Sequence, residues 1–317
     1  MKQTLQKFDT KSSSFSKTEV QQAFLRDGAV ILTNLFHDNN DEAWRDVAAA
    51  VPLLVWDRHD LLLQDGHCAD AVHTEHEKIN LSGEALHPHS DGYIWGDQFP
   101  DVVILVCQEP AGGDHHQGAN YLIDGYNIVK RLDTETRELL ETKLVDHTER
   151  SETSFVSGAE SIVPVIRWLD SAKGWRQNSS KRLCWRRMVN QKFCGKGAKD
   201  EAGNVLYSSL WAPVQGESSV DEVNTALLEM DRAIASEEGE ALRFTLNKGE
   251  TLIVDNYRML HAREAFHGLD QRRRMWRVWS WTNASFGLPP QVIASTKNKS
   301  NVPSNIHDAQ KSIEAEA

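Results

Sequence analysis

Short strand-like segments, bounded by glycine, proline, asparagine and serine, recur along most of the chain. The run VVILVCQEP at residues 102–110 is apolar for most of its length and ends at a proline, as expected of a buried strand. Segments of the same kind are AVILTNLF at 29–36, YLIDGY at 121–126, TLIVDN at 251–256 and RRMWRVWSWT at 273–282. This spacing of short strands and turns favours an antiparallel β core.

Helical periodicity is confined to a few stretches. A helix is expected after the capping residue Ser16, ending at Gly28. Residues 41–51, 126–144 and 220–238 also repeat apolar side chains at helical spacing, with a break near Asp133. We therefore expect an α+β fold that is mainly β: a double-stranded β-helix of the jelly-roll or cupin-like kind with flanking helices. Propensity alone does not separate it from a generic α+β fold.

The sequence shows no internal repeat, and we expect one double-stranded β-helix domain over residues 18–290. Residues 1–17, rich in serine and lysine, are expected to form a flexible N-terminal lead. Residues 291–317 are polar and are expected to form a loose C-terminal tail. The irregular stretches 56–99 and 150–220 are expected to be lid or insert regions, because long irregular segments in compact proteins are usually functional or mobile.

Charge and hydropathy limit the possible partners. The formal net charge is −11, which argues against a nucleic-acid partner. No apolar run approaches the ~18 residues of a transmembrane helix, and the N-terminal residues lack the apolar core of a secretory signal. We expect no membrane partner and a cytoplasmic location, where the four cysteines, which have no CxxC spacing, would be reduced. The oligomeric state stays open.

An imidazole and a carboxylate stand one residue apart in LHPHSDGYIW at 86–95, as His89 and Asp91. On an extended segment residues i and i+2 point to one face, so both side chains could bind one metal ion. The pair alone is a weak signal, because a surface hydrogen-bonded pair has the same spacing. Tyr93 and Trp95 continue the alternation, and would either face the same cavity or pack in the core.

A third ligand is available in KGETLIVDNYRMLHAREAF at 248–266, where a strand leads into a polar corner that holds His261. Alone, His261 would be interpreted as a core histidine. Two histidines and one carboxylate leave three positions of an octahedral ion open, as in non-haem Fe(II) oxygenases. Zinc more often takes a third nitrogen or sulfur ligand, and manganese could occupy the same site.

Arginine recurs in the apolar strand at 273–282, where Arg273 and Arg277 share one face. An inward-facing arginine needs a partner, because an unpaired buried charge is very costly, and its geometry suits a carboxylate. Arg272 and Arg274 lie on the other face, where solvent exposure is expected.

Together these segments resemble the TauD family of Fe(II)- and 2-oxoglutarate-dependent dioxygenases. In that family a His-x-Asp pair is followed by a GG(D/E)T…DG segment, a DN with a distal histidine, and an arginine. Here HSDG, GGDHHQGANYLIDG, DNYRMLHAREAF and RRRMWRVW occur in that order, and FLRDGAVILTNLF is similar to the family's start. The resemblance spans about residues 18–282.

The resemblance implies that His89, Asp91 and His261 bind iron. It also implies that Arg273 binds the distal carboxylate of the 2-oxoglutarate cosubstrate, and that Arg277 binds an anionic group of the substrate.

The middle motif departs from the family pattern. After GGD the family has a threonine that contacts the cosubstrate, whereas this chain has HHQGAN. Alignment back from LIDG puts Asn120 in the threonine's place. The role of His115 and His116, in the inserted stretch, stays open.

The implied reaction uses O₂ and converts 2-oxoglutarate to succinate and CO₂ while an unactivated C–H is oxidised. Asp91 argues against halogenation, because halogenating relatives have glycine or alanine there, so hydroxylation is the default. The expected substrate is a small amino-acid-like or carboxylate metabolite, zwitterionic or anionic. It would be contacted by Arg277, Tyr93, Trp95 and His87.

Three alternatives stay open at this stage. The first is an oxidative cyclase or desaturase of the same family in natural-product biosynthesis. The second is a non-catalytic jelly-roll protein that binds a metal or ligand. The third is a zinc hydrolase, against which Arg273 argues, because hydrolysis needs no carboxylate-binding arginine.

Overall fold

The structure is a computed structural model that describes part of the chain. The described residues are 5–35, 41–56, 59–64, 85–111, 117–146, 162–169, 180–183, 220–266 and 273–289. The inserted residues His115 and His116, most of the expected lid and insert regions, and the expected C-terminal tail lie outside these ranges.

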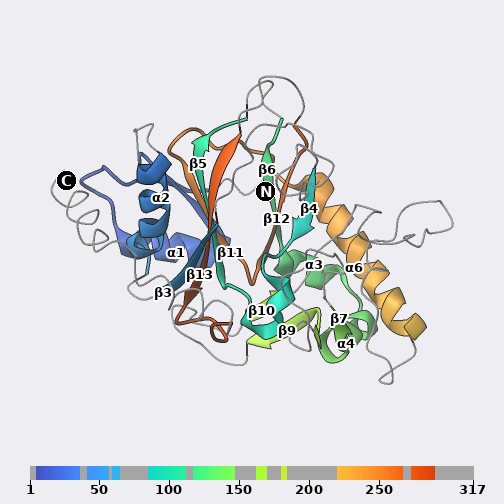
Figure 1. Ribbon diagram of the computed structural model, residues 1–317. Helices are drawn as coiled ribbons and strands as arrows, with labels where there is room; N and C mark the ends of the chain where they lie inside the picture. The colour runs from blue at the N-terminus through green and yellow to red at the C-terminus, as the bar shows by residue number, and fades with distance from the viewer. Residues whose placement is uncertain are drawn as a thin grey trace, which may run out of the picture.

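Two sheets provide the framework (Figure 1). The major sheet has the strand order β1-β2-β11-β5-β13-β3. Its strands, in that order, are Lys7–Asp9, Ala29–Thr33, Thr251–Asp255, Val102–Glu109, Arg274–Thr282 and His59–Gln64. All its pairings are antiparallel except that of β1 with β2.

The minor sheet has the order β4-β12-β6, with strands Leu86–His89, Met259–Arg263 and Asn120–Asp124. Two further pairs of short strands are also antiparallel. They join β9 (Ile166–Leu169) to β10 (Ser180–Leu183), and β7 (Val145–Asp146) to β8 (Ile162–Val163).

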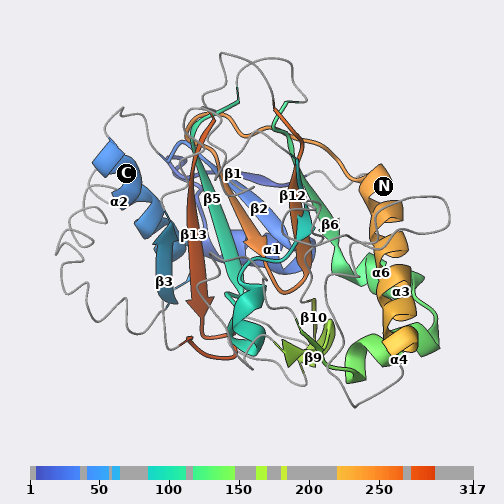
Figure 2. The same cartoon turned by 45° about the vertical axis from the view of Figure 1, so that its right-hand side comes forward.

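Helices cover the outer faces of both sheets (Figure 2). The major sheet packs against α1 (Lys17–Asp27), α2 (Asp41–Ala50) and the 3₁₀ helix η1 (Val51–Leu54). The minor sheet packs against α3 (Gly125–Arg131), α4 (Thr134–Thr142) and α6 (Val220–Glu240). No helix in the described part of the chain is long and apolar enough to cross a membrane.

Alternation along β5 shows how one strand serves two layers. Val102, Ile104 and Val106 join the cluster under α1 and α2, and Cys107 joins the cluster between the sheets. That inner cluster contains residues of both sheets, including Leu252 and Met259. Because strand side chains alternate between faces, β5 divides its residues between the helices and the space between the sheets.

The mainly β fold with flanking helices is confirmed. The expected helix signals also hold: Ser16 accepts a hydrogen bond from the Glu19 N–H at the start of α1, and Gly28 ends it with φ 75°. The expected break separates α3 from α4, where the Asp133 side chain caps the second helix.

Two local expectations were wrong. Residues 7–9 are not a loose lead, because Phe8 is buried and β1 pairs with β2. His261 lies within β12 instead of in a corner, since Leu260 and Ala262 bury that strand against the helices.

Candidate metal centre

Adjacent strands of the minor sheet bring two histidines together. His261 on β12 lies opposite His89 on β4 in the antiparallel register, and their ring centroids are 4.3 Å apart. Asp91 follows β4 by two residues. One candidate ligand atom from each residue lies within 4.8 Å of the others, and all three residues are buried. The structure therefore brings together the three side chains that the sequence suggested as metal ligands.

The ring nitrogens converge on one carboxylate oxygen. His89 Nδ1 lies 2.7 Å from the carbonyl of His87, which can only accept, so in the neutral imidazole Nδ1 carries the hydrogen and Nε2 has the lone pair. The Nε2 atoms of His89 and His261 lie 3.3 and 3.7 Å from Asp91 Oδ1. A metal ion between these three atoms would have two nitrogen ligands and one oxygen ligand.

The charge states of the site fit metal binding. Burial, together with the neighbouring His89, lowers the pKa of His261 to about 3, so its imidazole is neutral at physiological pH. Burial alone would raise the pKa of Asp91, but Arg277 and the two imidazoles outweigh it and hold that pKa well below its usual range. A neutral imidazole and an ionised carboxylate are the forms that bind metals.

The second oxygen of Asp91 faces the major sheet. Its Oδ2 accepts a hydrogen bond of 2.7 Å from Trp279 Nε1. Arg277 Nη1 donates to both carboxylate oxygens, at 3.3 Å to Oδ1 and 3.1 Å to Oδ2. Arg277, expected at the substrate, thus contacts the candidate ligand. Its role toward the substrate stays a prediction.

The backbone of Asp91 is held from the end of β11. The Asn256 amide oxygen accepts the Asp91 N–H at 2.8 Å, and the amide nitrogen donates to the Asp91 carbonyl at 2.9 Å. The same nitrogen donates to the Pro100 carbonyl at 2.7 Å. Gly92 adopts φ 75°, and a Cβ there would lie 2.4 Å from Pro100 Cδ, so the sharp turn after Asp91 requires glycine.

Arg273 and Asn120, both of which the resemblance assigns to the cosubstrate, meet in the interior. Arg273 Nη2 donates to Asn120 Oδ1 at 3.1 Å, and both residues are buried. Among the described residues, Arg273 has no carboxylate partner. A buried guanidinium with a neutral partner is an unbalanced charge, and an anionic ligand would complete it.

The remaining predicted contacts have mixed outcomes. The expectation that Tyr93 and Trp95 continue the strand alternation from Asp91 was wrong. Gly92 turns the chain into the 3₁₀ helix η2 (Tyr93–Gln98). Trp95 still packs edge-on against Trp279, with ring centroids 5.0 Å apart. The side chain of Tyr93 lies outside the described part of the structure. His87 lies on β4 beside His89, and its contact with substrate is untested.

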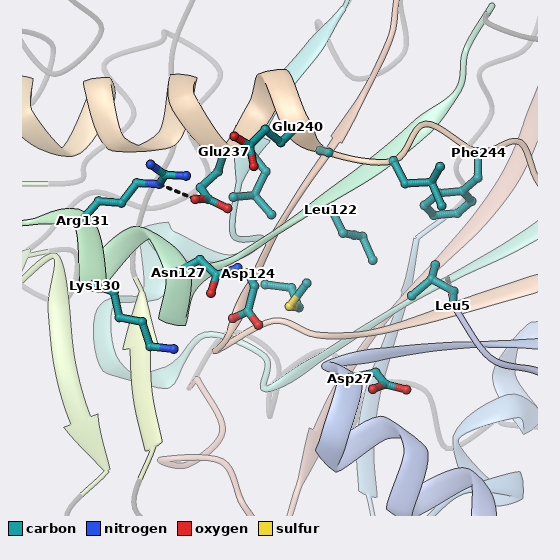
Figure 3. A pocket seen from close by; sticks show the side chains of 14 residues that line it. Leu5, Asp27, Leu122, Asp124, Asn127, Lys130, Arg131, Glu237, Glu240 and Phe244 are labelled. Carbon is teal, nitrogen blue, oxygen red and sulfur yellow. Dashed lines mark hydrogen bonds and ion pairs between the residues drawn. The ribbon is translucent and has the colours of Figure 1, made fainter. Parts of the chain in front are cut away.

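A cavity of about 460 Å³ lies elsewhere, between α3, the end of α6 and the start of the chain (Figure 3). Its lining includes Leu5, Leu122 and Phe244, but none of the three candidate metal ligands. Its charged side chains are largely paired, as Arg131 is with Glu237. The candidate metal site is therefore not part of this cavity.

The family model described as "Taurine catabolism dioxygenase TauD, TfdA family" matches residues 3–279. No curated protein sequence matches the chain.

Several solved structures share the fold. An asparagine oxygenase (AsnO) has a TM-score of 0.53 and 17% identity, covering 85% of this chain and 79% of its own. A variant of the non-heme iron oxygenase OrfP in complex with (3S)-hydroxy-L-arginine has a TM-score of 0.53 and 14% identity, covering 84% and 79%. AAD-2 in complex with Mn(II) and N-oxalylglycine has a TM-score of 0.53 and 14% identity, covering 91% and 97%.

Proposed function

The chain belongs to the TauD, TfdA family of dioxygenases. From this premise we propose that it is an Fe(II)- and 2-oxoglutarate-dependent oxygenase that hydroxylates an unactivated C–H of a small amino-acid-like or carboxylate metabolite. The main support for this proposal is the buried triad of His89, Asp91 and His261, whose candidate ligand atoms lie within 4.8 Å of one another.

The donor set of the triad fits Fe(II). Two imidazole nitrogens and one carboxylate oxygen on one side of an ion would leave its opposite side open for cosubstrate and O₂. Bound iron would supply the oxidising chemistry, with O₂ reduced and 2-oxoglutarate converted to succinate and CO₂. His261 Nε2 lies 3.7 Å from Asp91 Oδ1, so this ring nitrogen faces the place that the ion would occupy.

Arg273 supports 2-oxoglutarate as the cosubstrate. Arg273 is 7% exposed and its hydrogen-bond partner Asn120 is neutral. A bound carboxylate would therefore neutralise a buried positive charge that has no carboxylate partner among the described residues. In this proposal Arg273 binds the distal carboxylate and Asn120 orients the guanidinium.

The substrate class is supported by the neighbours and by the surroundings of the metal ligands. Two of the solved structures with this fold are an asparagine oxygenase and an oxygenase in complex with a hydroxylated arginine. Arg277 lies beside Asp91 and is a candidate for an anionic substrate group. Trp95, which packs on Trp279, is a candidate for the apolar wall that excludes water from the reaction.

Turnover tests the proposal. The purified protein is incubated with Fe(II), 2-oxoglutarate and O₂, and succinate is measured with and without each member of a panel of free amino acids and small carboxylates. The proposal predicts that one or more members accelerate succinate formation and gain one oxygen atom by mass spectrometry. Succinate formation that no member accelerates would contradict the substrate class, and no succinate at all would contradict the reaction.

A further inference from the structure

We propose that Trp279 is a positioning residue that makes Asp91 a one-oxygen ligand of the metal. The inference rests on the proposed function, because it requires a metal ion at the triad. It concerns a residue to which the sequence motifs assigned no role, on a strand of the opposite sheet.

The hydrogen bond between the two residues is short and buried. Trp279 Nε1 donates to Asp91 Oδ2 at 2.7 Å, and the two residues are 7% and 4% exposed. A hydrogen bond from a neutral donor to a carboxylate is stronger than one between neutral groups, and burial removes competition from water. The contact therefore restricts rotation of the Asp91 carboxylate.

The indole is itself held in place from two sides. The ring of Trp95 lies edge-on to it at 5.0 Å, and the Arg277 guanidinium lies 4.8 Å from its centroid. Its position on the inner face of β13 follows from the alternation that also places Arg277 there. The donor is thus rigid, which is what a group must be to orient a ligand.

Trp279 distinguishes the two carboxylate oxygens, whereas Arg277 does not. Arg277 Nη1 lies 3.3 Å from Oδ1 and 3.1 Å from Oδ2, so it neutralises the carboxylate as a whole. Trp279 bonds only Oδ2, and Oδ1 is the oxygen that faces both imidazoles. With Oδ2 held by Trp279, Asp91 would offer a bound ion one oxygen ligand and would leave a further position open.

The test uses Co(II) as a spectroscopic probe of the triad, with no substrate. The variant Trp279→Phe removes the N–H and keeps an aromatic ring. The matched control is Trp281→Phe, since Trp281 lies on the same strand and packs on Trp95 but donates to the Gln98 carbonyl. We expect Trp279→Phe to weaken Co(II) binding by about 10- to 100-fold in calorimetry, as loss of an outer hydrogen bond does.

The d–d absorption spectrum provides the readout that a purely structural role would not change. In Trp279→Phe the Oδ2 atom loses its shortest hydrogen bond and can also bind the ion, so the Co(II) bands should shift. Trp281→Phe should retain the wild-type spectrum and affinity. Wild-type affinity and spectrum in Trp279→Phe would overturn this inference but not the proposed function. Failure of the wild-type protein to bind Co(II) would overturn the proposed function as well.

If Trp279→Phe does not fold, the same test is made with 3-benzothienylalanine at position 279. This residue replaces the indole N–H by sulfur at nearly the same volume. The inference predicts the same loss of affinity and the same spectral shift, and wild-type behaviour would overturn it.

Discussion

Asn256 binds both backbone polar groups of Asp91, although the two residues are 165 positions apart in the sequence. A single amide thereby joins the end of β11 in the major sheet to the turn after β4 in the minor sheet. Side chain and backbone of Asp91 are thus both fixed by the major sheet, the first through Trp279 and the second through Asn256. The candidate metal site lies where the two sheets are connected by these hydrogen bonds.

Asn256→Ala should destabilise the protein and loosen the metal site. The variant leaves the N–H and C=O of Asp91 and the C=O of Pro100 without their partner, in a buried region. We expect a loss of about 2–4 kcal/mol in the free energy of unfolding, since each unsatisfied buried group costs about 1–3 kcal/mol. Urea denaturation measures it. Asn256→Asp keeps the hydrogen-bond acceptor but not the donor and should also be destabilised. Wild-type stability in both variants would contradict a stabilising role for the hydrogen bonds between Asn256 and the Asp91 backbone.

Asp91→Ala should abolish hydroxylation. The variant removes the only carboxylate of the triad and leaves two imidazoles, so both metal affinity and turnover are expected to fall. Succinate formation and Mn(II) calorimetry measure the two effects. The control Glu240→Ala removes a surface carboxylate at the end of α6 and should behave as wild type. Unchanged turnover in Asp91→Ala would remove Asp91 from the ligand set.

Arg273→Ala should sharply raise the 2-oxoglutarate concentration needed for turnover. Loss of a buried charge pair corresponds to about 2–5 kcal/mol. The measurement is the KM for 2-oxoglutarate. Arg274→Ala is the matched control, because the Arg274 guanidinium lies over Trp276 in the helix-facing layer. Normal saturation in Arg273→Ala would move the cosubstrate contact to another residue.

The metal-free protein should lose stability as the pH falls below about 6.5. The pKa of His261 is lowered to about 3 in the folded state, against 6.5 in an unfolded chain. Between these values the unfolded chain binds more protons, so stability rises with pH and is lost on acidification. The lowered pKa of Asp91 acts in the same direction at lower pH.

His261→Gln isolates the histidine's share of this pH dependence. We expect the slope of unfolding free energy against pH to flatten by up to about 1.4 kcal/mol per pH unit, the equivalent of one proton. Denaturation at a series of pH values between 4 and 7 is the measurement (about 1.4 kcal/mol is a readily resolved change). An identical slope in wild type and variant would show that His261 titrates normally.

The three candidate ligands could be proposed from sequence because their spacing carries information. His89 and Asp91 stand one residue apart, and His261 follows the DN of a strong strand signal. Their meeting in space is a consequence of the β4–β12 register, which local patterns do not specify. The order of motifs, through the family resemblance, supplied what local propensity could not.

Other parts of the site depended on tertiary contacts and were missed. Trp279 shares a strand face with Arg273 and Arg277, but nothing local shows that its N–H reaches Asp91. Asn256 lies in the DN motif, but the sequence indicates no role for its side chain. Trp95 was placed by an alternation that Gly92 interrupts, because the positive φ of this glycine ends the extended segment. Strand β1 was missed because three residues with one buried side chain, Phe8, carry no periodic signal.

The most direct test is an anaerobic absorption spectrum of the purified protein with Fe(II) followed by 2-oxoglutarate. A 2-oxoglutarate molecule chelating iron at the triad should give a weak metal-to-ligand charge-transfer band in the visible region. The band should be absent in Asp91→Ala and should require more 2-oxoglutarate in Arg273→Ala. Bound Fe(II) without any such band in the wild-type protein would contradict the central claim that the open face of this triad receives the cosubstrate.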